Sequence, residues 1–452
     1  MKSTGWYVWC IAAIAALGGL LFGYDWVVIG GAKPFYEAYF RITSVQLQGW
    51  AMSCALVGCL LGSLVSGVIS ERFGRKPSLQ AAALTFVISS VGTGLAGSFP
   101  SFVIWRVAGG LAIGLASSLS PLYISELSPA RLRGRLVCLN ELTIVLGILF
   151  AQVTNMLIAG YKSEAITPWD VASGWRWMFG LTAVPATVFL LGMLFVPESP
   201  RWLALRGREA EARVILERVG GRENADLVFA ELAQNEATDR SREQEKSELK
   251  MGRNGVLLLG VGLAVLQQWC GINVIFNYAH DIFRAAGYNL SASFFNIVVT
   301  GITMVLFTFL ALATVDRNGR RILMLAGCAC LAVIYLALGY FFHLQSRGFH
   351  MLVLVIMALA TYAMTLAPVT WVVLSEIFPA SIRGKAMAMA TASLWAACFV
   401  LTYTFPLLNA GLGTAGTFWL YAFVCMIGFA GIYRWLPETK GQTLEEIEAL
   451  LT

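Results

Sequence analysis

One acidic residue interrupts a long apolar stretch near the start of the sequence. Asp25 stands in the run FGYDWVVIGG, where a helix that crosses a bilayer would bury it. A carboxylate is costly inside a membrane, so it is expected to have a charged partner, to carry a proton, or both. The candidate partner is Arg106, in the apolar run around WRVAGG. The pair therefore indicates either proton transfer or a permanent structural ion pair.

A second group of polar residues lies in the run QQWCGIN, which holds Gln267, Gln268 and Asn273. Neutral amides donate and accept hydrogen bonds, the chemistry that binds a ligand rich in hydroxyl groups. On an ideal helix, Gln267 and Asn273 point about 240° apart and could not both face one ligand. Gly271, between them, predicts a break, and broken membrane helices occur where they line a cavity. The alternative is that these amides tie neighbouring helices together.

The elements that must position these groups are membrane helices. The chain of 452 residues is 58% hydrophobic and 13% charged, and its mean hydropathy is +0.71, as in polytopic membrane proteins. Twelve apolar runs are near the length of about 20 residues that crosses a bilayer. Their approximate ranges are 6–31, 49–70, 78–98, 101–121, 137–160, 176–196, 254–276, 294–314, 322–343, 350–374, 386–409 and 416–436. Asp25 would then lie about 9 Å and Arg106 about 8 Å below the same membrane surface, so the two charges could meet.

The loops indicate how the chain is oriented. Lys and Arg favour cytoplasmic loops, and with both termini inside the external loops hold only Lys33, Arg41, Lys162, Arg284 and Arg347. The net charge of +6 is therefore explained by membrane topology, and nucleic-acid binding is not expected. We predict a multi-pass protein of the cell membrane with both termini in the cytoplasm.

No sequence pattern indicates an enzyme. The nine cysteines lie in or beside apolar runs without a CxxC pair, and the three histidines lack metal-ligand spacing. The sequence also lacks a nucleophile elbow, a phosphate-binding loop and a zinc-protease motif. We therefore expect no catalytic residues, no metal and no cofactor.

Three motifs occur twice, once in each half of the chain. SERFGRKP matches TVDRNGRR, PLYISELSPARLRGR matches WVVLSEIFPASIRGK, and PESPRW matches PETKGQ. Their acidic and basic residues are Glu71, Arg75, Glu126, Arg133, Glu198, Asp316, Arg320, Glu376, Arg383 and Glu438. Three repeats at a nearly constant offset indicate two parallel halves of six helices, which is a transporter architecture.

The repeats divide the chain into four predicted segments. They are an N-terminal six-helix bundle over 1–196, cytoplasmic linker helices over 197–253, a C-terminal six-helix bundle over 254–436 and a cytoplasmic tail over 437–452. The linker, with LRGREAEARVILERVGG, favours short amphipathic helices, although it could be only a solvated connection. The repeated acids and arginines could form ion pairs that close the cytoplasmic face and break when it opens. The alternative is charge that only sets topology.

Across nearly its whole length the sequence resembles the sugar porters of the major facilitator superfamily. The matching segments are GGLLFGYD, SERFGRKP, WRVAGGLAIGLAS, PLYISELSPARLRG, PESPRW, QQWCGIN, VDRNGRR, SEIFPASIRGK and PETKG. The resemblance implies an all-α membrane protein with a central monosaccharide site and alternating access. It implies sugar contacts at Gln152, Gln267, Gln268 and Asn273, and aromatic walls at Phe22, Trp371 and Trp395. Each of these aromatic side chains could instead only pack.

Four positions differ from the pattern of the family. Met304 stands where an amide is common, Leu394 and Cys398 where polar residues are common, and Trp26 where a small residue is usual. The C-terminal half is therefore expected to contact fewer sugar hydroxyl groups. The sequence leaves the sugar open between pentoses and hexoses and assigns no consequence to Trp26.

The resemblance also bears on energy coupling. An acid at the position of Asp25 accompanies proton symport in the family, whereas uniporters tend to have a neutral residue there. We predict a proton-coupled monosaccharide symporter that functions as a monomer in the lipid bilayer, with Arg106 released when Asp25 is protonated from outside. A uniporter is the alternative, and a sugar sensor is disfavoured because only a short tail follows PETKG. Glu141, near the cytoplasmic end of the fifth helix, is a second proton candidate.

Overall fold

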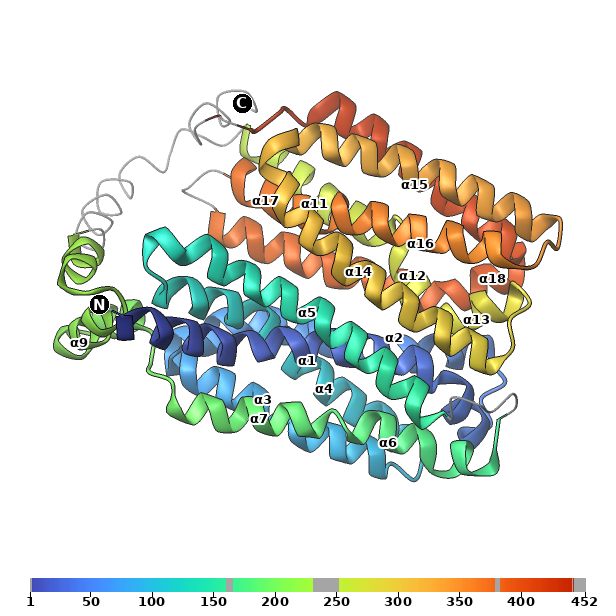
Figure 1. Cartoon of the computed structure of the whole chain (residues 1–452), viewed down its shortest axis with the longest axis horizontal. Coiled ribbons are helices and arrows are strands. Elements are labelled where there is room, and N and C mark those ends of the chain that lie inside the picture. The colour runs from blue at the N-terminus through green and yellow to red at the C-terminus, as the bar shows by residue number, and fades with distance from the viewer. Residues whose placement is uncertain (1, 160–165, 231–251, 379–382, 441, 443–452) are drawn as a thin grey trace.

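The computed structural model describes all residues except 1, 160–165, 231–251, 379–382, 441 and 443–452. The described part is helical and contains no β-strand. Figure 1 shows two bundles side by side, one from each half of the chain, with most helices running along the longest axis of the molecule. Short helices that follow the first bundle lie at one end of the pair. We call this the linker end, and the opposite one the far end.

The N-terminal bundle and the first part of the linker contain the following helical elements. They are α1 (Lys2–Phe40), α2 (Val45–Phe73), α3 (Arg75–Leu95), α4 (Phe99–Leu127), α5 (Ala130–Ile158), the π-helix η1 (Asp170–Gly174), α6 (Trp175–Gly180), α7 (Ala183–Phe195), α8 (Pro200–Leu205) and α9 (Glu209–Gly220). The last two are short helices within the segment 197–253.

The C-terminal bundle repeats this order with broken helices at two places. Its elements are α11 (Gly252–Trp269), α12 (Ile272–Asn277), α13 (Ala279–Ala285), α14 (Leu290–Asn318), α15 (Arg320–His343), α16 (Phe349–Met364), α17 (Leu366–Ile377) and α18 (Arg383–Trp435).

The number of membrane crossings agrees with the sequence. Eleven described helical spans are long and apolar enough to cross a bilayer. The longest, Lys385–Trp435, holds two crossings because Gly413 has a non-helical φ of 70° and interrupts α18. Apolar side chains such as Leu64, Phe195 and Leu306 are more than half exposed, as expected for surfaces that face lipid. The prediction of an all-α membrane protein with twelve spans is confirmed.

Close backbone contacts hold the N-terminal bundle together. α2 packs along α4, where a Cβ atom on Gly110 would lie 1.9 Å from the carbonyl oxygen of Ala55. Gly114, one turn later, approaches the carbonyl oxygen of Cys59 in the same way. Small residues four positions apart let membrane helices approach closely. This packing fixes α4, and therefore fixes the position of Arg106 one turn before Gly110.

The first helix is longer than the predicted span of 6–31. It continues through Pro34 to Phe40, so Lys33, which we expected in an external loop, lies inside the helix with only 8% of its surface exposed. Ion pairs from Lys33 to Glu37 and Asp281 stabilise this polar turn. The span predicted from hydropathy ended too early, because charged residues such as Lys33 and Glu37 were interpreted as part of a loop.

Candidate functional site

Asp25 and Arg106 meet inside the N-terminal bundle. Arg106 Nη1 on α4 donates to Asp25 Oδ1 on α1 at 2.6 Å, and both side chains are more than nine-tenths buried. The guanidinium also lies 5.0 Å from the ring centroid of Phe179 on α6. Asp25 Oδ2 and Arg106 Nε have no hydrogen-bond partner in the described part of the chain. One guanidinium therefore compensates the carboxylate, and protonation of Asp25 would weaken that attachment.

The helix break predicted at Gly271 is present. Gly271 has a left-handed φ of 86° and separates α11 from α12. Across the break, Asn273 Nδ2 donates to Gln268 Oε1, and Gln268 Nε2 donates to Gln267 Oε1 at 3.1 Å. All three side chains are buried. The break thus brings together amides that an ideal helix would point apart, and they form one hydrogen-bonded chain.

Gln152 reaches from the N-terminal bundle towards the C-terminal one. Its Nε2 on α5 donates to Thr300 Oγ1 on α14 at 3.4 Å. Its Oε1 is buried and has no hydrogen-bond partner among the described residues. Gly301 permits this approach, because a Cβ atom there would lie 1.9 Å from that oxygen. Gln152 therefore joins the bundles and keeps one acceptor available for a ligand.

An aromatic cluster also joins the bundles. Phe22 and Trp26, one turn apart on α1, face Trp395 on α18, with ring centroids 5.6 Å and 6.0 Å from that of Trp395. Phe22 and Trp26 are only partly buried, although they point towards the other bundle and not towards lipid. Both rings therefore lie at the interface between the bundles. Trp371 on α17 is also partly buried, but the structure does not bring it into ring contact with these three.

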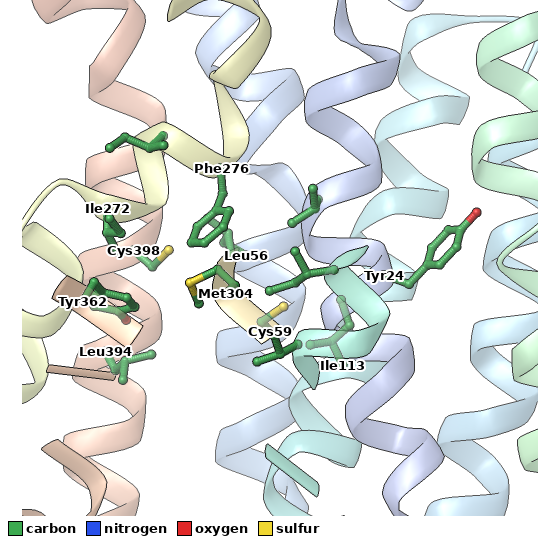
Figure 2. Close-up of a cluster of buried hydrophobic side chains, with 14 of the residues drawn as sticks. Tyr24, Leu56, Cys59, Ile113, Ile272, Phe276, Met304, Tyr362, Leu394 and Cys398 are labelled. Carbon is green, nitrogen blue, oxygen red and sulfur yellow. The ribbon is translucent and has the colours of Figure 1, made fainter. Parts of the chain in front are cut away.

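The three apolar departures are buried inside the protein. Met304 on α14 is 4% exposed, and Leu394 and Cys398 on α18 are 6% and 0% exposed. Figure 2 shows all three among the buried apolar side chains that include Phe276. Cys398 Sγ lies 3.8 Å from Asn273 Nδ2. A sugar hydroxyl that faces this apolar side would lack a hydrogen-bond partner, which costs binding free energy.

The repeated motifs form a network at the linker end of the N-terminal bundle. Arg75 donates to both carboxylate oxygens of Glu126 at 3.0 Å, and Ser199 Oγ donates to the same carboxylate at 2.5 Å. Glu198 Oε1 accepts the backbone N–H groups of Arg75 and Lys76 at 3.0 and 3.1 Å. Glu198 thus satisfies the first amide groups of α3, where a negative charge also interacts favourably with the helix dipole.

The C-terminal bundle repeats this network residue for residue. Arg320 lies 3.3 Å from Glu376, and Thr439 Oγ1 donates to Glu376 at 2.5 Å. Glu438 accepts the backbone N–H groups of Arg320 and Arg321 at 2.8 and 3.2 Å, at the start of α15. In both networks these contacts join elements of one bundle. That such pairs close the cytoplasmic face stays a prediction.

Of the four remaining predicted gate residues, the structure describes the side chains of two. The side chain of Glu71 is exposed, and its backbone carbonyl accepts from Trp202 Nε1 of α8 at 2.9 Å. Arg133 is exposed near the start of α5. The side chains of Asp316 and Arg383 lie outside the described part of the chain.

Sequence reasoning missed a charged cluster at the far end. Lys33 Nζ on α1 lies 2.8 Å from Asp281 Oδ2 on α13 and 3.4 Å from Glu37 Oε2 on its own helix. We call Lys33, Glu37 and Asp281 the far-end charge cluster. The spacing of Lys33 and Glu37, four positions apart, was a signal in the sequence. It was overlooked because the predicted first helix ended at residue 31.

The sequence and the structure both match known transporters. Residues 11–451 match the family model described as "Sugar (and other) transporter". The D-xylose-proton symporter of Escherichia coli (strain K12) is 38% identical, over 98% of this chain and 96% of that protein. The arabinose-proton symporter of Bacillus subtilis (strain 168) is 36% identical, over 98% of this chain and 95% of that protein.

A solved structure extends the similarity to three dimensions. The xylose transporter XylE from E. coli, in a partially occluded inward-open conformation, has a TM-score of 0.86 and 36% identity, with 97% of this chain and 99% of that chain covered. The matches span almost the whole sequence and include both bundles. The resemblance seen in the sequence is therefore confirmed, and this chain belongs to the sugar transporter family.

Proposed function

We propose that this chain is a proton-coupled monosaccharide symporter of a bacterial plasma membrane and that it works by alternating access. The relatives named above are a xylose-proton and an arabinose-proton symporter. The observation that carries the proposal is the position of Asp25 on α1. Its carboxylate contacts Arg106 inside the N-terminal bundle, while Phe22 and Trp26 on the same helix face Trp395 of the other bundle. A proton site and a sugar site thus share one helix.

The sugar site has the chemistry that a monosaccharide needs. Its hydroxyl groups would bind Gln152, Gln267, Gln268 and Asn273, which combine donors and acceptors without a net charge. Its C–H faces would contact the rings of Phe22 and Trp395, with Trp371 as a further wall. All of these residues belong to one chain, so a monomer is sufficient for transport.

The arrangement of the bundles fits a state that is closed at the far end. Between described residues of the two bundles, the ion pair, the ring contacts and the side-chain hydrogen bond lie at the centre or towards the far end. They include the stacked rings of Phe35 and Phe294, 6.3 Å apart, and the edge contact of Trp50 with Phe399. Because Lys and Arg concentrate at the linker end, we place that end in the cytoplasm together with both termini. The site then opens inward.

In the proposed cycle, a proton from outside neutralises Asp25 and weakens its attachment to Arg106. Sugar binds between the bundles, and the bundles rock so that the far end closes and the linker end opens. Release of sugar and proton to the cytoplasm resets the carrier. Glu141, partly buried on α5, remains a second candidate for carrying the proton.

Transport in proteoliposomes tests this function. A thermal-shift screen of pentoses and hexoses first identifies a ligand, because a ligand that binds only the folded state raises its stability. Counterflow of that labelled sugar should then occur, and an inward proton gradient should drive its accumulation. Counterflow without any response to the gradient would indicate a uniporter. Binding without counterflow would indicate a sensor.

Gln268→Ala should weaken sugar binding by about 1–3 kcal/mol, the cost of leaving buried polar groups unpaired. Gln268 is the middle member of the amide chain, so its loss also frees Gln267 and Asn273. Titration calorimetry with the identified sugar measures the change. The matched control is Gln80→Ala, because Gln80 donates to the Met193 carbonyl within the N-terminal bundle and far from the site. Equal affinities in both variants would mean that Gln268 is structural.

A further inference from the structure

Lys33 occupies a position in which it joins the two bundles. Only 8% of its surface is exposed, and its ammonium group lies 2.8 Å from Asp281 on α13. The same group lies 5.7 Å from the ring centroid of Tyr278, at the junction of α12 and α13. Lys33 therefore makes its strongest contact with the opposite bundle.

The backbones of the two bundles also touch here. Gly30, one turn before Lys33, lies so close to α12 that a Cβ atom would be 2.7 Å from the carbonyl oxygen of Asn277. On the next turn of α1, Phe35 stacks on Phe294 of α14. At Gly30 and Phe35, α1 is thus in direct contact with the C-terminal bundle. These contacts form a closed seam, and the ion pair of Lys33 with Asp281 lies along it.

A cavity of about 500 Å³ borders the far-end charge cluster. Its lining includes all three members of the cluster, together with Arg284. Arg284 is exposed and lies three positions after Asp281 on the same helix. The cluster therefore lies between the seam and the solvent of the far end, where an external gate would be.

The far-end charge cluster contains one more carboxylate than a single permanent ion pair requires. Lys33 alone contacts two carboxylates, one on the opposite bundle and one, Glu37, on its own helix. Glu37 Oε1 is buried without a hydrogen-bond partner in the described part of the chain. If the bundles separate, Lys33 still has Glu37 four positions along α1, and Asp281 has Arg284 three positions along α13. Each bundle would then keep a balanced pair of charges.

We propose that Lys33 and Asp281 form the external gate of the transport cycle, an inference that rests on the proposed alternating access. In the closed state Lys33 bonds to Asp281 across the seam. In the outward-open state Lys33 pairs with Glu37 and Asp281 pairs with Arg284. This exchange of partners keeps both charges compensated in each state, so that the gate can open without leaving a buried charge unpaired.

The distance between the external ends of the bundles tests the gate in purified protein, without sugar or a proton gradient. Leu47→Cys on α2 and Leu412→Cys on α18, both exposed, would carry spin labels. The partly or fully exposed Cys10, Cys138 and Cys330 are first replaced by Ser, and the other native cysteines are buried. Double electron–electron resonance spectroscopy then gives the populations of short and long distances between the two spin labels.

Lys33→Gln and Asp281→Asn should each raise the ratio of long to short distances about tenfold, as expected for the loss of one charge-assisted hydrogen bond. The double variant should show no further rise, because both changes remove the same contact. Glu37→Gln is the matched control. It removes a charge from the same cluster but leaves the contact across the seam, so the ratio should stay the same or fall.

Unchanged distances in folded Lys33→Gln and Asp281→Asn would overturn the gate, and so would an equal rise in Glu37→Gln. If a single variant does not fold, the double variant Lys33→Gln with Asp281→Asn decides. A rise of about tenfold in the ratio of long to short distances supports the gate, and a parent-like distribution refutes it. A failure of the proposed function is distinguishable, because it would appear as missing counterflow in the parent protein.

Discussion

Asp25→Asn should abolish the accumulation of sugar driven by a pH gradient, so that the ratio of the sugar concentration inside to that outside stays at about one. The amide keeps the size of the side chain and resembles the protonated acid at every pH. Arg106 therefore loses its charged partner permanently, and no proton can be released to the cytoplasm. Counterflow should persist, since the amide chain around Gln268 and the aromatic cluster are untouched. Both activities are measured in the same proteoliposomes.

The control for this prediction is a second buried aspartate. Asp170 is 3% exposed and accepts hydrogen bonds from Thr167 near the far end, away from the sugar site. Asp170→Asn should keep accumulation as well as counterflow. If Asp25→Asn folds and still concentrates sugar against its gradient, the coupling role of Asp25 is wrong. Glu141→Gln would then be the next variant to measure.

Sequence alone predicted the parts of this site that depend on local geometry. The contact between Asp25 and Arg106 was predicted from the helical rise, which places both residues at the same depth below one membrane surface. Each charge is costly alone in an apolar medium, so opposite charges at equal depth are expected to pair. The break at Gly271 followed from amides that one continuous helix would have pointed apart. Both inferences use distances along single helices, which the sequence specifies directly.

The parts that sequence could not predict depend on contacts between distant segments. Trp26 replaces the small residue that is usual in the family, and the sequence assigned no consequence to this difference. In the structure its ring joins the cluster of Phe22 and Trp395. Glu198 and Glu438 were expected to pair with arginine side chains, but each accepts backbone amide groups at a helix start. Lys33 was assigned to a loop because the predicted first helix ended at residue 31. Its contact with Asp281 could not be predicted, because Asp281 comes from the other half of the chain.

Arg106→Gln should lower the free energy of unfolding by about 3–5 kcal/mol, the cost of removing one member of a buried ion pair. The substitution leaves the Asp25 carboxylate buried without the guanidinium that compensates its charge. The change is measured by titration with a denaturing detergent. Arg176→Gln is the matched control. Arg176 donates to the Gly94 carbonyl at the far end, so its loss should cost only about 1 kcal/mol.

The double variant Asp25→Asn with Arg106→Gln separates the structural from the functional part of the pair. Two neutral amides of similar size leave no buried charge, so most of the lost stability should return. Counterflow should return with it, whereas accumulation driven by protons should remain absent. A double variant as unstable as Arg106→Gln alone would show that the guanidinium stabilises the bundle through other contacts, such as that with the Phe179 ring. Recovery of accumulation would instead place proton coupling outside this pair.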